Sequence, residues 1–483
     1  SSGGIISLEK GGLQSGGTID VEEATLKLGD DYNKTAGILN TSLEGTDLEL
    51  TESLTLTSDT AVNLRTLSSN EKIFTLGSES TDLTINDPVT MKVADDQIRT
   101  NSADLIMNGL VTIDNGGIDS DNGTVTFNGG LIQSGGLLNI NNTLLILGAD
   151  VTKTGGILQT IASSLKAVRD LTFSSNSSLS VITINLGSNT LTLGSETSDL
   201  LITDNLTFSE ADGILQSGSA DVTVEGNALL NQGKFISTNG TIIFRKGGLQ
   251  SGTFELNLGE SIFSLSGNYI KDGGIVSSSS ATLNLLDNIT IKSDSSLTFS
   301  ELELNDMSLT LGSESTDFIV NSPITLDHEG EWIITEDADL SLLSYINISY
   351  GGISSTGGII SLFGGGQLSG NGTLDLTSSS WGLGSDFIKS GGTLETSETD
   401  LELSANITLT SNEALSFVNL RLNDLTLTLG SSTSDLSIDN AVFIDASSEG
   451  ILTADADLIL YSILTMSDGQ LTSTGGKLKL AHG

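Results

Sequence analysis

Four aspartates occupy the same position in a sequence that recurs four times, and a carboxylate repeated at fixed spacing can bind a cation. The sequence reads TLGSESTDLTI at residues 75–85, and similar stretches begin at residues 192, 310 and 428. The aspartates are Asp82, Asp199, Asp317 and Asp435. An Asp that hydrogen-bonds to nearby backbone at a turn is the simpler interpretation. The tandem GGxGxDxUx nonapeptides of calcium-binding repeats are absent from the sequence. We therefore predict a structural corner, with a Ca²⁺ contact as the alternative.

A second repeated chemistry is that of four lysines, each followed by a corner of small residues. The corners read KTAG, KTGG, KDGG and KSGG, and their lysines are Lys34, Lys153, Lys271 and Lys389. We predict that they lie at the surface, where each forms a local ion pair worth under ~1 kcal/mol. The alternative is a row of cations that binds an anionic glycan or a neighbouring molecule. Two positions earlier stand Tyr32, Val151, Tyr269 and Phe387. Valine offers no ring for sugar stacking, so a position for any bulky residue fits this set better than a sugar-binding row.

The third repeat departs from the others in a short segment rich in potential ligands. It contains Asp327, His328, Glu329, Glu331 and Trp332. These residue types fit a metal or sugar site. Sequence drift in a solvated acidic loop is the simpler interpretation.

Catalysis has little support in the sequence. The chain has no cysteine, and its two histidines, His328 and His482, fall at unrelated repeat positions. The HExxH, GxSxG and phosphate-binding P-loop motifs are absent from the sequence. A glycan-cleaving site needs clustered carboxylates in one cleft, whereas here they are spread over every copy. We therefore expect no enzymatic activity and no cofactor.

These residues belong to a superrepeat of about 118 residues, because all the markers return in the same order. The copies cover residues 1–118, 119–236, 237–354 and 355–472, and residues 473–483 repeat the start of the chain. We predict one continuous solenoid over 1–483. We also predict that the sequence is a window of a longer array.

Within each superrepeat a shorter period is visible, which predicts the fold. Segments of x-L-x-L or x-I-x-I alternation are separated by GG, SGG, NG and SDG turns. Alternation places every second side chain in a core, and the turn residues allow sharp corners. We predict an all-β, parallel β-solenoid with about six coils of ~20 residues per superrepeat. Coils spaced ~4.8 Å apart make a rod ~115 Å long, and equivalent residues of successive superrepeats then lie on one face if the coils do not twist much.

The charge restricts the partners. The 61 acidic and 19 basic residues give a net charge of −42. Such a chain repels nucleic acid and anionic membrane surfaces. No apolar segment approaches the ~18 residues that span a bilayer. We expect neither nucleic-acid binding nor membrane insertion.

The phrases GGQLSGNGTLDL, at residues 365–376, and GGTLETSETDLELSANITLTS, at residues 391–411, resemble the arrays of giant bacterial cell-surface adhesins. They are similar in style to filamentous-haemagglutinin-like and autotransporter-passenger repeats. The resemblance implies a right-handed β-helix that acts outside the cell or at its surface. The expected function is a structural rod segment of a fibre or adhesin, acting as stalk, spacer or coat. It would associate with itself end to end or side by side, or with cell-surface glycans. The alternative is a carbohydrate-binding or polysaccharide-cleaving β-helix.

Overall fold

The chain folds into short parallel β-strands that wind in successive coils. The computed structural model describes residues 2–396 and 398–481. In that part of the chain there are 65 strands, from β1 (Ser2–Leu8) to β65 (Leu478–Leu480), and no helix. None of its elements is therefore a candidate for a membrane-spanning helix. The strands are short because a turn former follows each alternating segment.

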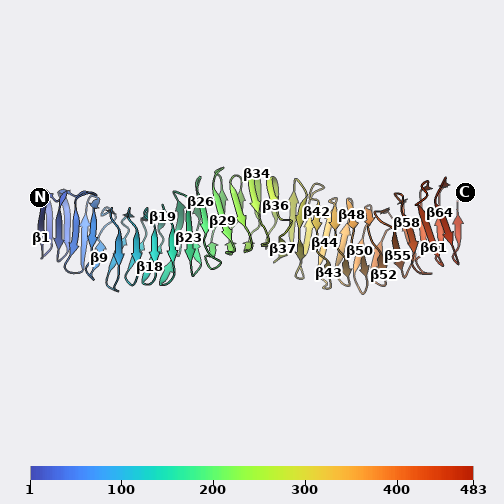
Figure 1. The fold of residues 1–483 in the computed structure, drawn as a ribbon, viewed down its shortest axis with the longest axis horizontal. Coiled ribbons are helices and arrows are strands. Elements are labelled where there is room, and N and C mark those ends of the chain that lie inside the picture. Colours follow the sequence, from blue (N-terminus) through green and yellow to red (C-terminus); the bar gives the residue numbers. More distant parts are fainter. Residues whose placement is uncertain (1, 397, 482–483) are drawn as a thin grey trace. The chain divides into compact units, whose positions relative to one another are not determined.

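The structure divides into two compact units. The first comprises residues 1–242 and 253–257, and the second comprises residues 243–252 and 258–483. Within each unit the strands of successive coils run side by side (Figure 1).

Each coil of the first unit passes through three sides. In one coil, Ile98 pairs with Ile118, so the chain returns to the same side after 20 residues. The first side contains β2 (Gly12–Asp20), β4 (Tyr32–Asn40), β6 (Leu54–Ser58), β9 (Ile73–Leu76), β12 (Gln97–Asn101), β15 (Gly117–Asp121), β18 (Leu137–Asn141) and β21 (Ile157–Gln159). The second contains β7 (Val62–Leu64), β10 (Leu83–Ile85), β13 (Leu105–Met107), β16 (Thr124–Phe127), β19 (Leu144–Leu147), β22 (Ser164–Ala167) and β25 (Ile184–Asn185). The third contains β11 (Val89–Met91), β14 (Val111–Ile113), β17 (Leu131–Gln133), β20 (Val151–Lys153), β23 (Leu171–Ser175) and β26 (Thr190–Leu193).

The second unit repeats this plan, with Ile333 pairing to Ile353 across one coil. One side contains β36 (Tyr269–Ser277), β38 (Ile289–Ser293), β41 (Ser308–Leu311), β44 (Trp332–Glu336), β47 (Gly352–Ser355), β50 (Thr373–Asp375) and β53 (Thr393–Glu395). The next contains β39 (Leu297–Phe299), β42 (Phe318–Val320), β45 (Leu340–Leu342), β48 (Ile359–Leu362), β51 (Ser380–Leu383), β54 (Asp400–Leu403) and β57 (Asn419–Arg421). The last contains β43 (Ile324–Leu326), β46 (Ile346–Ile348), β49 (Gly366–Leu368), β52 (Phe387–Lys389), β55 (Ile407–Ser411), β58 (Thr426–Leu429), β61 (Gly450–Ala454) and β64 (Gln470–Ser473).

The core of each unit is formed by the inward residues of these strands. In β10 the first and last residues, Leu83 and Ile85, point inward and are completely buried. They pair with Leu105 and Met107 of the next coil. Parallel pairing in register stacks like residues on one another, so apolar columns run through the coils. Burial of each Leu or Ile contributes roughly 1.5–3 kcal/mol against the entropy of ordering the chain.

One β-bulge returns at a fixed place in every superrepeat. The register shifts after a buried hydroxyl residue in β12, β29 (Ile214–Gly218), β44 and β61. The residue at each shift has positive φ: 48° for Asn101, 58° for Gly218, 48° for Glu336 and 45° for Ala454. Only the second copy has glycine there, which adopts this conformation without strain. The bulge is thus a recurrent element of the backbone.

The predicted parallel β-solenoid is confirmed, with paired residues 20 apart at Ile98 and 24 apart at Tyr32. The right-handedness and the superrepeat boundaries stay predictions.

The expectation that equivalent residues share one face is wrong. Lys34 lies in β4 on the first side of its unit, but Lys153 lies in β20 on the third. In the second unit, Lys271 of β36 and Lys389 of β52 also lie on different sides. The 119 residues from Lys34 to Lys153 (153 − 34) do not make a whole number of coils.

Candidate functional site

The corner aspartates lie at equivalent places, and three of the four, Asp82, Asp199 and Asp435, bond to the next coil. They directly precede β10, β27 (Leu200–Ile202), β42 and β59 (Leu436–Ile438). The Asp82 Oδ1 atom accepts the backbone N–H of Asp104 at 3.0 Å, one coil further on. Asp199 accepts from Asp221 at 3.0 Å, and Asp435 accepts from Asp457 at 2.7 Å. These bonds bridge 22 residues, whereas an Asx turn bonds locally.

The partner aspartates repeat the same bond. Asp104 accepts the N–H of Thr124 at 2.7 Å, and Asp221 accepts that of Thr241 at 2.7 Å. In the second unit, Asp457 likewise accepts the N–H of Lys477 at 2.7 Å, so a corner of each unit carries carboxylates bonded from coil to coil beside the backbone ladder. A Ca²⁺ contact at Asp317 or its equivalents stays an alternative.

The predicted surface position of the four repeated lysines is wrong. The exposed fractions of Lys34, Lys153, Lys271 and Lys389 are 1%, 4%, 4% and 2%. Each lysine ends a strand segment in which alternate residues point inward, so it has the same orientation as the residue two positions before it. A long aliphatic chain can cross the core and bring its ammonium to a corner.

The corner partners of these ammonium groups differ between copies. Lys34 pairs with Asp59, and Lys271 pairs with Asp294. Lys389 Nζ lies 2.8 Å from Glu413 Oε1 and donates to Asn412 Oδ1 at 2.9 Å. Lys153 Nζ donates to Asn176 Oδ1 at 2.6 Å, an uncharged partner.

These differences affect protonation. The hydrogen bond from Lys271 holds the pKa of the Asp294 carboxyl below its ordinary value. Burial lowers the pKa of the Lys153 ammonium. The buried lysines are therefore internal ionic contacts, and Lys153 is the one that has only a neutral partner among the bonds described.

A glutamine and a tyrosine lie beside the lysine in the first and third copies. Tyr32 donates from its hydroxyl to Gln14 Oε1 at 2.6 Å, and Gln14 Nε2 donates to the Ile38 carbonyl at 2.9 Å. Tyr269 donates to Gln250 in the same way. The tyrosine ring lies over a glycine, because a Cβ on Gly12 would meet Tyr32 Cδ2 at 3.4 Å.

The other two copies change this pair differently. In the fourth, Leu368 and Phe387 replace Gln and Tyr together, so neither of these two positions carries a polar side chain. In the second, Gln133 is kept but Val151 replaces the tyrosine, and Leu131 replaces the glycine. Gln133 is completely buried, and its Oε1 has no hydrogen-bond partner. Gln133, Val151 and Lys153 line a small internal cavity at this place.

The third-copy segment brings ligand atoms together around one imidazole. His328 Nδ1 lies 2.8 Å from Asp327 Oδ1, 3.4 Å from Asp306 Oδ1 and 3.9 Å from Glu331 Oε2. Asp306 comes from the preceding coil, and sequence reasoning missed it. Asp306, His328 and Glu331 are the one group of this kind, within the described ranges, that is compact enough to hold a metal ion.

The turn that presents the imidazole is well fixed. Glu331 Oε2 accepts the backbone N–H groups of Asp327 at 2.8 Å and His328 at 3.1 Å. Trp332 Nε1 donates to the Glu329 carbonyl at 3.0 Å. Of the five predicted residues, the structure thus brings Asp327, His328 and Glu331 together, while Glu329 and Trp332 order the turn.

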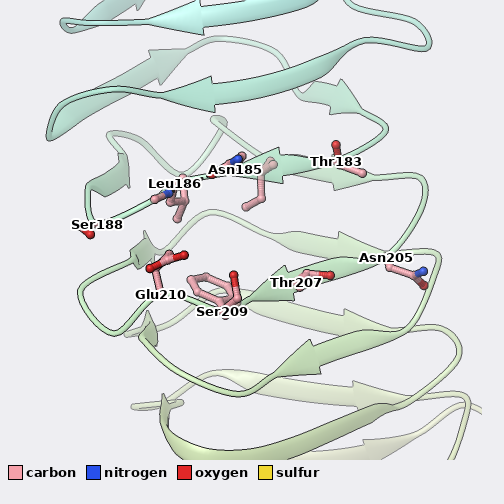
Figure 2. A pocket seen from close by; sticks show the side chains of 11 residues that line it. Thr183, Asn185, Leu186, Ser188, Asn205, Thr207, Ser209 and Glu210 are labelled. Atoms are coloured by element: carbon pink, nitrogen blue, oxygen red, sulfur yellow. Dashed lines mark hydrogen bonds between the residues drawn. The ribbon is translucent and has the colours of Figure 1, made fainter.

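The second superrepeat has a groove of about 400 Å³ at its surface. Figure 2 shows that its labelled residues come from two successive coils, with Thr183 and Asn185 on one and Asn205 and Thr207 on the next. Hydroxyl and amide groups predominate, and Glu210 adds a carboxylate. Such a lining suits a polar neutral ligand.

The chain matches no family model, and neither the curated proteins nor the solved structures contain a significant match to it.

Proposed function

We propose that this chain is a structural rod segment of an extracellular or cell-surface fibre, and that it acts as a stalk, spacer or coat element rather than as an enzyme. The observation that supports this proposal most is that every coil is tied to the next by parallel backbone pairing within each unit. A force along the coil axis then loads many hydrogen bonds at once. The carboxylate ladders at the corners add side-chain bonds in the same direction.

The electrostatics fit a molecule that must stay apart from its neighbours. A net charge of −42 favours solubility and opposes side-by-side association at low ionic strength. Salt or divalent cations screen this repulsion, so association end to end or side by side depends on the ionic conditions.

Electron microscopy of the purified chain tests the proposal. With about 24 coils at ~4.8 Å, the expected particle is a rod ~115 Å long. A compact particle with both dimensions well below that length contradicts the rod. Surface labelling of intact source cells with an antibody against the chain tests the location, and labelling only after permeabilisation contradicts it.

The groove of the second superrepeat favours carbohydrate binding as a second candidate function, because hydroxyl and amide side chains line it. A glycan array on the intact chain, followed by a depolymerisation assay, separates this function from the structural one. Binding that is lost in Thr207→Ala supports the groove. Cleavage that is lost in Glu331→Gln instead places an enzyme at the third-copy turn.

A further inference from the structure

The imidazole of His328 lies within reach of three carboxylates from two coils. Its Nδ1 atom is 2.8 Å from Asp327 Oδ1, 3.4 Å from Asp306 Oδ1 and 3.9 Å from Glu331 Oε2. In a tetrahedral site with bonds of ~2.0–2.1 Å, ligand atoms lie about 3.3–3.4 Å from one another. The distances from Nδ1 to the three carboxylate oxygens bracket this value, and the ligand atoms of Asp306, His328 and Glu331 all lie within 4.8 Å of one another.

The site is rigid on one side and open on the other. Glu331 is 7% exposed and is fixed by its two backbone hydrogen bonds. A Cβ on Gly351 of the next coil would meet the Glu331 carbonyl at 2.0 Å and the His328 carbonyl at 2.8 Å, so the turn packs closely on the backbone beneath it. The His328 side chain is 61% exposed, which leaves a path for an ion from solvent.

The fourth superrepeat shows which of these side chains belong to the turn itself and which is specific to the third copy. There Glu449 caps the same turn by accepting the N–H groups of Asp445 at 2.7 Å and Ala446 at 3.4 Å. Asp424 corresponds to Asp306. It follows Asp306 by 118 residues, and both aspartates lie in equivalent turns and have φ near 65°. The three carboxylates therefore belong to the architecture of the turn. The imidazole is the one ligand type that the third copy adds.

We propose that Asp306, Asp327, His328 and Glu331 form a binding site for a borderline divalent transition-metal ion such as Zn²⁺ or Co²⁺. One imidazole nitrogen among carboxylate oxygens suits these ions, whereas Ca²⁺ and Mg²⁺ prefer oxygen ligands alone. The ion would tie the turn before β41 to the turn before β44 in the next coil.

Histidine NMR on the intact chain tests the proposal directly. The sequence has only two histidines, so imidazole-labelled protein gives two sets of ring signals, and His328→Ala identifies those of His328. Zn²⁺ is titrated at ~0.15 M salt, with Ca²⁺ as the control for general attraction to the acidic surface. We expect Zn²⁺, but not Ca²⁺ at the same concentration, to shift the His328 ring signals.

Isothermal titration with the variants measures affinity and stoichiometry. His328→Ala removes a ligand and should lower the affinity for Zn²⁺ at least about tenfold, because loss of an outer-shell partner alone typically costs about 10–100-fold. Ala446→His places an imidazole in the carboxylate set of the fourth copy and should add a second site of similar affinity. Circular dichroism confirms that both variants keep the fold.

Three results overturn the proposal. One is unchanged Zn²⁺ affinity in His328→Ala. Another is an equal shift of the His328 signals by Ca²⁺, which indicates general cation attraction. The third is a folded Ala446→His variant without a second site, which shows that this arrangement of four side chains is insufficient.

Discussion

Gln133 shows that a buried side chain in a repeat protein depends on the identity of its neighbours. In the first and third copies a tyrosine hydroxyl donates to the glutamine oxygen, and in the fourth copy both residues are apolar. Only the second copy combines Gln with Val, and its oxygen is left without a partner. A buried acceptor without a hydrogen bond costs about 1–3 kcal/mol.

Introducing the Gln–Tyr pair of the first and third copies at Gln133 should recover part of this cost. Val151→Tyr alone overpacks against Leu131, and Leu131→Gly alone opens a cavity, so each should destabilise the chain by about 1–3 kcal/mol. In the double variant, the introduced ring can lie over glycine and its hydroxyl can donate to Gln133. We expect the double variant to have a higher urea midpoint than either single variant.

A double-mutant cycle provides the control. It compares the change in unfolding free energy of the double variant with the sum of the changes in the two single variants. A favourable coupling of about 0.5–3 kcal/mol is expected for residues in contact. Strict additivity of the two single changes would show that the mismatch does not involve this contact.

Removal of the charge should change the free energy of unfolding in opposite directions at Lys153 and at Lys271. Lys153→Met removes a buried ammonium with a neutral partner, so we expect the free energy of unfolding at pH 7 to increase. Lys271→Met leaves Asp294 without its cation, so we expect a decrease of about 1 kcal/mol. Urea unfolding of both variants beside the unmodified chain measures the difference.

The pH dependence follows from the direction of each pKa shift. The pKa of Lys153 is lowered from 10.5, so the cost of its charge is present at low pH and disappears as pH rises toward 10.5. The advantage of Lys153→Met should therefore shrink over that range. The pKa of Asp294 is lowered from 3.8, so its stabilisation is lost as pH falls through the folded value. The deficit of Lys271→Met should accordingly vanish in acid, and a deficit independent of pH would contradict the ionic role.

The burial of these lysines was within reach of sequence reasoning. In β20, Lys153 has the same alternation phase as Val151, with Thr152 between them pointing outward. The general preference of lysine for the surface points the other way, and in the structure the alternation phase decides the burial. Asp306 was missed for a different reason, because its approach to His328 depends on how two coils stack, which the linear sequence does not contain.

The recurrent β-bulge offers a test of backbone strain. Gly218 and Ala454 occupy equivalent bulge positions with φ of 58° and 45°. Ala454→Gly should raise the free energy of unfolding by up to about 1 kcal/mol, because alanine is strained at positive φ. Gly218→Ala should lower it by about the same amount, since a Cβ there has only the Leu193 carbonyl within 4 Å, at 3.9 Å. Equal effects of the same sign would show that φ is not the cause.

The corner ladder distinguishes a structural aspartate from a calcium ligand. Asp199→Ala removes the acceptor for the Asp221 N–H, and we expect a loss of about 1 kcal/mol. Asp199→Asn keeps an acceptor oxygen and should be nearly neutral. Thermal unfolding with and without Ca²⁺ completes the test. A calcium-dependent stabilisation that both variants abolish would favour the cation contact instead.

The strands themselves were predictable because alternation and turn formers act locally. Segments such as TLTL and LTI carry their own inward and outward residues, and Gly or Asn marks the corner after them. The side on which each strand lies was not predictable. Coil lengths vary, as the 20 and 24 residues at Ile98 and Tyr32 show, and these small differences accumulate over a superrepeat.

The excess of 61 acidic over 19 basic residues should make stability depend on ionic strength. Like charges repel most strongly in the folded chain, where they are closest, and salt screens them. We expect the melting temperature to rise by several degrees between ~10 mM and ~0.5 M NaCl, as measured by circular dichroism. A melting temperature that falls with salt would show that attractive ion pairs outweigh the repulsion.

The mismatch between superrepeat and coil has a consequence for symmetry. Because Lys34 and Lys153 lie on different sides of one unit, the operation that relates successive superrepeats combines a rotation with a translation. This is a screw operation, and it arises because the length of the superrepeat is not a whole number of coils. A feature encoded once per superrepeat, such as the buried lysine, therefore lies on different sides within one unit and forms no stripe there. Equivalent residues of similar sequence copies can in this way face different directions and have different neighbours.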